Sequence, residues 1–132
     1  MRSVVIGAGA LGGLVGALMS EAGEELTLIE INESRARLLG ETGLFISRGD
    51  EGERCVPMDV KSTVAELPHA DLVFIAVKSY QTEAAVKGAL PVIGPDTYVL
   101  SMQNGIGNTE TIAELIGPER VLCGITYHSI QH

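Results

Sequence analysis

Val4-Val5-Ile6-Gly7-Ala8-Gly9-Ala10-Leu11-Gly12-Gly13 is the stretch of this sequence that decides the fold. An apolar run of strand-forming residues leads into glycines spaced G-x-G-x-x-G, and a helix-forming stretch follows at once. In such a unit the first glycine makes the tight turn, the second lets a phosphate approach the backbone, and the third lets the helix pack closely on the sheet. Glycine-rich turns also occur for purely structural reasons, but the strand before and the helix after favour a dinucleotide-binding loop. We expect its N–H groups to hold the phosphates, with these binding residues: Gly7, Ala8, Gly9, Ala10, Leu11 and Gly12.

Length and composition limit the class of protein. The 132 residues carry 17 acidic and 9 basic side chains, a formal net charge of −8, and 45% of them are hydrophobic. A chain of this size forms a single domain, residues 1–132, with a real core. The acidic balance argues against nucleic-acid binding, which needs clustered cations. The start of the chain does not resemble a signal peptide, and its longest apolar helical stretch, residues 10–19, is too short for a membrane span. We therefore expect a cytoplasmic protein.

The two cysteines and the histidines do not suggest a metal centre. Cys55 and Cys123 are far apart in the sequence and lie in apolar, strand-like segments. Two buried free thiols are the favoured interpretation, although a disulfide between them stays open. No spacing of His, Cys and carboxylate side chains resembles a metal site.

Strand and helix signals alternate along the chain. The sequence predicts strands at 3–6, 26–30, 44–47, 54–56, 71–77, 97–101 and 121–126, and helices at 10–22, 32–39, 62–66, 81–90 and 108–115. Gly40 is expected to end the second of these helices, and Asn108 is expected to cap the last one. This β-α-β alternation predicts an α/β fold with a doubly wound parallel sheet of the Rossmann-like type.

Four polar or glycine-rich segments lie at the ends of predicted strands or just after them. They are the glycine loop, Glu30, Lys78 and the segment 103–105. The carboxyl ends of parallel strands share one edge of a sheet, and ligands bind there near the topological switch point. The sequence therefore predicts one site that contains all four segments.

Glu30 bears on the choice of dinucleotide. It follows Gly12 by 18 residues, close to where an acidic side chain accepts hydrogen bonds from the adenosine ribose. A carboxylate there favours NAD and repels a 2′-phosphate, unless Glu30 is simply a solvated side chain at a strand end. Arg35 and Arg37 in the next helix are placed to reach a phosphate, so NADP stays open.

Lys78 and Asn104 are the candidates for contact with a substrate. Lys78 ends an apolar strand, where its ammonium group suits a carboxylate or a cofactor phosphate. Asn104 lies in Gln103-Asn104-Gly105, where its amide suits the substrate or the nicotinamide ribose. The alternatives without a functional role are that Lys78 is a surface lysine and that Asn104 belongs to an ordinary Asn-Gly turn.

Taken together, three segments resemble ketopantoate reductase (2-dehydropantoate 2-reductase). They are Gly7-Ala8-Gly9-Ala10-Leu11-Gly12-Gly13, Val77-Lys78-Ser79-Tyr80-Gln81-Thr82 and Gln103-Asn104-Gly105-Ile106-Gly107-Asn108, and 124–128 resembles the end of that family's nucleotide-binding domain. The resemblance covers essentially the whole chain. It implies NADPH-dependent reduction of a small 2-oxo acid, 2-dehydropantoate, in pantothenate biosynthesis. It also implies that Lys78 and Asn104 serve cofactor and substrate binding in catalysis.

Two departures from the family pattern qualify this expectation. Ile31 stands where family members often place an arginine for the 2′-phosphate, which favours NAD. The helical C-terminal domain, which supplies the family's proton-donating lysine, is absent from these residues. We therefore expect a cofactor-binding domain that is incomplete for catalysis by itself. The face that would meet a second domain could also form a homodimer. Two alternative functions stay open, an NAD(H)-binding regulatory module without catalysis and a reductase of another 2-oxo acid.

Overall fold

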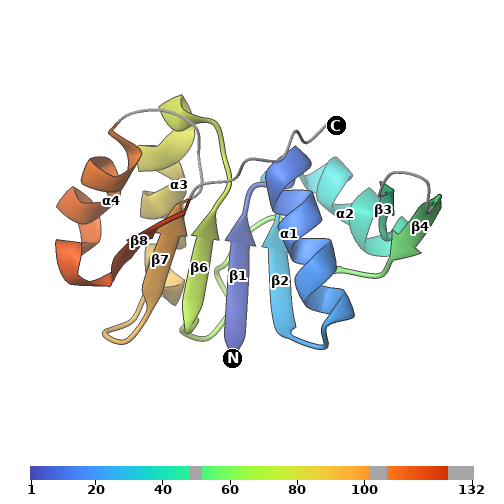
Figure 1. Cartoon of the computed structure of the whole chain (residues 1–132), viewed down its shortest axis with the longest axis horizontal. Coiled ribbons are helices and arrows are strands. Elements are labelled where there is room, and N and C mark those ends of the chain that lie inside the picture. The colour runs from blue at the N-terminus through green and yellow to red at the C-terminus, as the bar shows by residue number, and fades with distance from the viewer. Residues whose placement is uncertain (48–51, 102–106, 125–132) are drawn as a thin grey trace.

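The fold is a doubly wound parallel sheet. The computed structural model describes residues 1–47, 52–101 and 107–124. Its main sheet has the order β5-β2-β1-β6-β7-β8, and every neighbouring pair is parallel (Figure 1). The strands are β1 (Arg2–Ile6), β2 (Glu25–Ile29), β5 (Asp59–Lys61), β6 (Leu72–Ile75), β7 (Tyr98–Ser101) and β8 (Val121–Cys123). This confirms the expected fold class, and the strand order reverses at β1, between β2 and β6.

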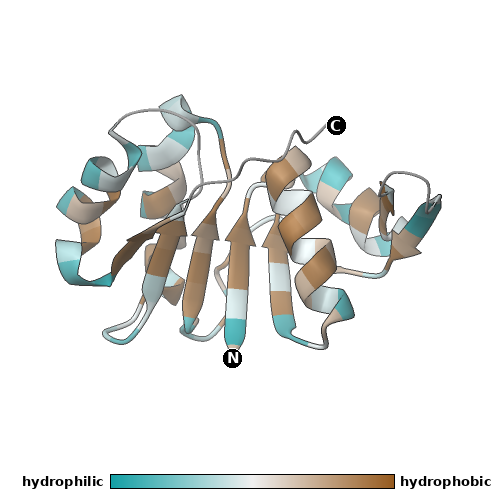
Figure 2. Ribbon diagram, in the orientation of Figure 1, coloured by the Kyte–Doolittle hydropathy of each residue, from teal (hydrophilic) through white to brown (hydrophobic). Residues whose placement is uncertain are grey.

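The helices cover the two faces of this sheet. They are α1 (Ala10–Glu21), α2 (Glu33–Thr42), α3 (Thr82–Ala89) and α4 (Asn108–Ile116), with short 3₁₀ turns at Ser79–Gln81, Leu90–Val92 and Pro118–Arg120. Alternate residues of the central strand β1 enter different cores, since Val4 and Ile6 pack with residues of α3 and α4, and Val5 packs with residues of α1. In Figure 2 the strand β6 and the carboxyl-terminal half of β1 are hydrophobic, as strands covered on both faces are.

A two-stranded antiparallel sheet extends the α1 side. It is formed by β3 (Leu44–Ser47) and β4 (Glu53–Val56), which confirms the expected strand pair. Helix α1 approaches it closely because glycines line the contact. A Cβ on Gly13 would lie 3.1 Å from Leu44 Cδ2, and one on Gly16 would lie 2.9 Å from Met58 Cε. The glycines after the loop are therefore packing residues of α1.

Several local predictions were wrong. The second helix continues through Gly40 to Thr42, and Gly43, with φ +78°, ends it. The predicted helix at 62–66 is absent, and the strand β5 just before it was missed. That three-residue strand forms because it pairs with β2, where the Thr27 hydroxyl donates to Asp59 at 2.9 Å, and such pairing leaves no local sequence signal.

Other boundaries and burial assignments also differ. The predicted strand 71–77 is the shorter β6, the helix 81–90 is α3 flanked by 3₁₀ turns, and β8 ends at Cys123. Both cysteines are free, but Cys55 and Cys123 are exposed and not buried as expected. In β4 the burial alternates, with Arg54 and Val56 turned inward and Cys55 on the exposed face. Cys123 is the last residue of β8, which lies at the end of the strand order of the main sheet. Within the described residues, no helix has the length and apolarity that crossing a bilayer requires.

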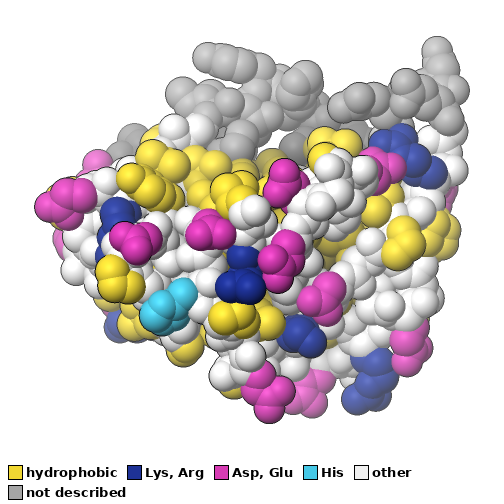
Figure 3. Space-filling view, turned by 90° about the horizontal axis from the view of Figure 1, so that it is seen from below, with side chains coloured by type: hydrophobic (Ala, Val, Ile, Leu, Met, Phe, Trp, Pro, Cys, Tyr) yellow, Lys and Arg dark blue, Asp and Glu magenta, His cyan; other side chains and the backbone are white. Residues whose placement is uncertain are grey.

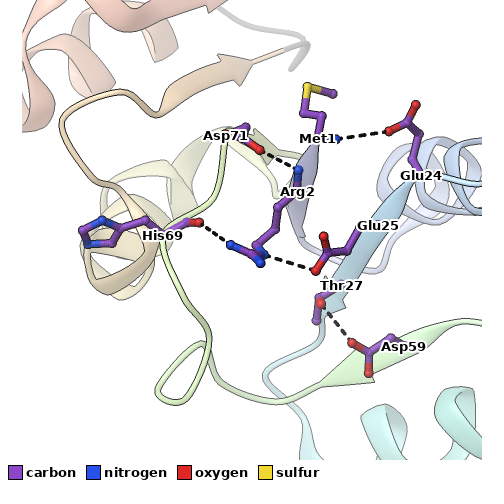
Figure 4. Close-up of polar contacts among 8 residues, drawn as sticks. All are labelled: Met1, Arg2, Glu24, Glu25, Thr27, Asp59, His69 and Asp71. Carbon is purple, nitrogen blue, oxygen red and sulfur yellow. Dashed lines mark hydrogen bonds and ion pairs between the residues drawn. The ribbon is translucent and has the colours of Figure 1, made fainter.

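The edge of the sheet where the strands begin is held by charged contacts. Arg2 donates through Nε to Glu25 at 3.2 Å and through Nη1 to the His69 carbonyl at 3.3 Å, and its backbone N–H donates to Asp71 at 2.7 Å (Figure 4). Acidic and basic side chains are interspersed over this side of the molecule (Figure 3). Because these charges pair within the fold, this edge has a structural role, and the opposite edge carries the candidate site.

Candidate functional site

The carboxyl ends of three adjacent strands bring three of the four predicted segments together. The fourth, 103–105, lies outside the described residues. Ile6 of β1 is in register with Ile29 of β2 and Ile75 of β6. The next backbone groups continue this pairing, because the Gly7 N–H donates to the Ile29 carbonyl at 3.0 Å and the Ala76 N–H donates to the Ile6 carbonyl at 2.9 Å. The glycine loop, Glu30 and the segment leading to Lys78 therefore leave the sheet side by side, at the ends marked by the arrowheads in Figure 1.

The three fingerprint glycines differ in what the fold requires of them. Gly7 has φ +108°, and a Cβ there would lie 2.9 Å from the Ala76 carbonyl oxygen. A Cβ on Gly12 would collide with the Gly7 carbonyl oxygen. A Cβ on Gly9 would meet nothing within 4 Å. The fold therefore explains Gly7 and Gly12, whereas Gly9 keeps open a space that no described residue fills.

The N-terminus of α1 opens onto that space. Gly9 is the N-cap and offers no side-chain acceptor, and the first turn carries no acidic residue. The Gly13 N–H donates to the Gly9 carbonyl at 2.8 Å, which leaves the N–H groups before it without a partner inside the helix. Free N–H groups and the positive end of the helix dipole favour an anion at this place. These features fit the pyrophosphate of a dinucleotide.

Glu30 lies next to this loop in a fixed orientation. Its side chain is only 12% exposed, and its Oε1 accepts a hydrogen bond from Arg35 Nη1 at 2.9 Å. Its Oε2 accepts from the Asn32 N–H at 3.2 Å. Arg35 Nη2 also donates to the Ala8 carbonyl of the glycine loop at 3.0 Å. The neighbouring Ile31 side chain is 77% exposed. Glu30 is thus not a freely solvated glutamate.

The contact between Arg35 and the glycine loop was not specified by the sequence. Arg35 and Arg37 were equal candidates to approach a phosphate, since both lie in the predicted second helix. The structure separates them, because Arg35 contacts Glu30 and Ala8 whereas Arg37 lines a groove between α2 and residues 60–66. The only hint in the sequence is that Glu30 and Arg35 are five residues apart, on either side of a helix start. The conformation of the turn at Ile31 and Asn32 determines that the two side chains come into contact.

Lys78 lies at the same edge, on the far side of β1 from Glu30. It is exposed and lies after β6, separated from Ile75 by Ala76 and Val77. Its backbone N–H donates to Gln81 Oε1 at 3.3 Å, which fixes the start of the 3₁₀ turn. Within residues 1–47, 52–101 and 107–124, no ion pair holds its ammonium group. The other predicted substrate contact, Asn104, lies outside the described residues.

Asn108 has a different role from the predicted helix cap. Gly107, with φ +92°, is the N-cap of α4, and Asn108 is the first helical residue. The buried Asn108 side chain accepts from the Thr82 hydroxyl at 3.0 Å and donates through Nδ2 to Ser79 Oγ at 3.2 Å. It therefore ties the start of α4 to the segment that follows Lys78. A polar residue at a predicted helix start suggests a helix cap. The packing of α3 on α4 instead places Thr82 and Ser79 within hydrogen-bond distance of the Asn108 side chain.

Replacing Asn108 with alanine is expected to lower the free energy of unfolding by about 1–3 kcal/mol, because the buried hydrogen bonds of its amide to Thr82 and Ser79 are lost. Urea unfolding measures this loss. The exposed Glu114 of the same helix provides the control, and Glu114→Ala is expected to change stability by less than about 0.5 kcal/mol. Equal effects of the two substitutions would show that the Asn108 contacts contribute nothing.

The comparisons with known proteins agree with this geometry. The model of the family Ketopantoate reductase PanE/ApbA matches residues 3–132. A 2-dehydropantoate 2-reductase of Pyrococcus horikoshii is 41% identical over 128 residues, which are 96% of this chain and 40% of that protein. The crystal structure of 2-dehydropantoate 2-reductase from Geobacter metallireducens superposes with a TM-score of 0.87 at 28% identity, over 98% of this chain and 42% of that one.

A solved relative carries ligands. The ternary structure of D-mandelate dehydrogenase with NADH and anilino(oxo)acetate has a TM-score of 0.82 and 29% identity to this chain, and the match covers 95% of this chain and 40% of that one. The chain spans about 40% of the length of the curated relatives that it matches. The glycine fingerprint, the strand order and the match over residues 3–132 thus lead to one conclusion: the chain belongs to the ketopantoate reductase family.

Proposed function

We propose that this chain is the cofactor-binding part of an NAD(P)H-dependent reductase that converts the ketone of a 2-oxo acid, 2-dehydropantoate in the first place, to a hydroxyl group. The observation that carries the proposal is the space at Gly9 that no described residue fills. It lies beside the α1 N-terminus after β1, which is flanked in the sheet by β2, leading to Glu30, and β6, leading to Lys78. Family membership supports the choice of reaction. The substrate is a small molecule, and the surface, with its net charge of −8, does not suit nucleic acid.

Each group at this edge has a part in that function. The reduced dinucleotide, when bound, supplies the hydride. The N–H groups of α1 bind its pyrophosphate, with Gly9 allowing close approach, and Glu30 accepts hydrogen bonds from the adenosine ribose. Lys78 binds the substrate carboxylate or a cofactor phosphate as a point charge. For Asn104, which lies outside the described residues, we keep the expectation that its amide binds the substrate or the nicotinamide ribose. Such positioning is what a protein contributes to hydride transfer.

We infer a preference for NAD over NADP as the cofactor, and two features support it. A 2′-phosphate at the adenosine ribose would face the Glu30 carboxylate, which is held in place from two sides. The resemblance to the family supports the same preference, since Ile31 stands where its members often place an arginine for the 2′-phosphate. Electrostatic repulsion therefore opposes NADPH, and the ribose hydroxyls of NADH find an acceptor.

A second candidate is the reductase of a different 2-oxo acid. The specific observation that favours it is the similarity to a D-mandelate dehydrogenase solved with NADH and anilino(oxo)acetate. The cofactor part of the site is the same in both candidates. Rates of NADH oxidation with 2-dehydropantoate and with aromatic 2-oxo acids separate them.

Titration with NADH and NADPH tests the proposed function on the 132-residue chain. Saturable binding of a nicotinamide dinucleotide is expected, and absence of binding would overturn the proposal. If the gene encodes further residues after His132, oxo-acid reduction is expected from that longer product. Binding without turnover in the longer product would instead favour a regulatory module.

The variant Lys78→Ala tests whether the Lys78 ammonium group binds the cofactor or the substrate. We expect an increase of about tenfold or more in the Kd for NADH if Lys78 binds a cofactor phosphate, or in the KM for the oxo acid of the longer product if it binds the substrate carboxylate. Lys87→Ala is the control, because Lys87 is an exposed lysine of α3 that is paired with Glu83 at 2.9 Å. Unchanged Kd and KM in Lys78→Ala would remove Lys78 from the site.

A further inference from the structure

Arg35 joins the two parts of the candidate cofactor site. Its Nη1 donates to Glu30 at the end of β2, and its Nη2 donates to the Ala8 carbonyl in the glycine loop. We propose that the Glu30–Arg35 pair is the specificity switch of this site: Arg35 holds Glu30 as the acceptor for the ribose hydroxyls of NADH, and Arg35 becomes a ligand for the 2′-phosphate of NADPH when Glu30 releases it. This inference rests on the proposed function and names the residue that sets its cofactor preference.

The first step concerns what Glu30 can still accept. Each carboxylate oxygen has one partner in the described residues, Arg35 for Oε1 and the Asn32 N–H for Oε2. An ionised carboxylate offers about four acceptor positions, so about two remain. Two remaining acceptors match the two hydroxyls of a ribose diol. Because the partners hold the carboxylate from two sides, it is preorganised for that contact, and little rotamer entropy is lost on binding.

The second step concerns what Arg35 can still donate. A guanidinium group has five N–H donors, and the contacts with Glu30 and Ala8 use one on Nη1 and one on Nη2. The Arg35 side chain is 42% exposed, so the remaining donors are accessible to a ligand. Its anchor on Ala8 keeps the guanidinium beside the loop that is proposed to hold the pyrophosphate. Planar, paired donors of this kind suit a phosphate group.

The third step concerns the charge balance of the pair. In the native chain the Arg35 charge is offset by Glu30 at 2.9 Å, so a 2′-phosphate meets a neutralised pair and a nearby carboxylate oxygen. Replacing the carboxylate with an amide removes both obstacles, because the repulsion disappears and Arg35 keeps a full uncompensated charge. A gain in NADPH affinity from Glu30→Gln should therefore depend on Arg35 being present.

A double-mutant cycle with two cofactors tests this dependence. The proteins are the unaltered chain, Glu30→Gln, Arg35→Ala and the double variant, and the probes are NADH and NADPH titrated by fluorescence. We expect Glu30→Gln to shift the ratio of NADPH to NADH affinity about tenfold or more toward NADPH. We expect the double variant to show a smaller shift, because it keeps only the part that comes from removing the carboxylate. Arg35→Ala alone is expected to weaken NADH binding, because Glu30 loses its orientation. Far-ultraviolet circular dichroism and thermal melting confirm that each variant is folded.

Arg37→Ala is the matched control on the same helix. Arg37 lines the groove against residues 60–66 and is expected to leave the affinity ratio unchanged. An equal shift by Glu30→Gln with and without Arg35, or an equal effect of Arg37→Ala, would overturn the proposed switch while dinucleotide binding itself persists. Failure of the unaltered chain to bind either cofactor would instead overturn the proposed function, and the two failures are thus distinguishable.

Discussion

Replacing Gly9 with alanine is expected to weaken dinucleotide binding by about 100-fold or more while the protein stays folded. A Cβ at this position meets no atom of the described residues within 4 Å, so the free chain has room for it. The same methyl group occupies the space in which the pyrophosphate is proposed to approach the first turn of α1. A loss of about 2.7 kcal/mol corresponds to 100-fold in Kd, and displaced hydrogen bonds to a charged group reach this size.

Fluorescence titration of NADH measures the change in Kd, and urea unfolding measures stability. We expect the free energy of unfolding to change by no more than about 1 kcal/mol, because alanine is a poorer N-cap than glycine but reduces the freedom of the unfolded chain. Gly88→Ala is the matched control, since a Cβ there also meets nothing within 4 Å and lies in α3. If Gly9→Ala binds NADH as tightly as Gly88→Ala does, the glycine loop is not the binding site of the cofactor phosphates.

Replacing Gly12 with alanine is expected to have the opposite profile, with a loss of stability of about 3 kcal/mol or more. A Cβ on Gly12 collides with the Gly7 carbonyl oxygen and comes within 3.1 Å of Ala76 Cβ. The first of these is a backbone atom of the tight turn that follows β1, so it cannot rotate away as a side chain does. Relief requires either α1 to move off the sheet or the turn to open. The measurement is the urea midpoint together with the melting temperature.

Gly13→Ala provides the comparison in the next position of the helix. Its added Cβ would meet Leu44 Cδ2 at 3.1 Å, which is the end of a side chain that can adjust. We expect a smaller loss, about 1 kcal/mol, because a terminal methyl group moves at low cost. If Gly12→Ala is as stable as Gly13→Ala, the third fingerprint glycine is not required for the close approach of α1 to the turn.

Much of the fold could be predicted because its signals are local. The alternation of apolar runs and helical stretches indicated the parallel sheet, and the order of the segments placed the glycine loop, Glu30 and Lys78 at strand ends. Those strand ends lie at one edge, as the parallel register of β1, β2 and β6 shows. The errors fall where long-range contacts outweigh local preference. β5 exists only through pairing with β2, and the helix expected at 62–66 did not form.

The sequence by itself determined the doubly wound fold, the family and the edge of the sheet that carries the candidate site, because spacing along the chain encodes turns, helix starts and strand ends. Tertiary structure alone decided which glycine is free of packing demands, that Arg35 rather than Arg37 contacts the loop, and that Asn108 bridges to Ser79 and Thr82. These facts depend on distances between segments that are far apart in the chain. Side-chain identity states which contacts are chemically allowed, and only the packing of α1, α2 and α4 on the sheet selects among them.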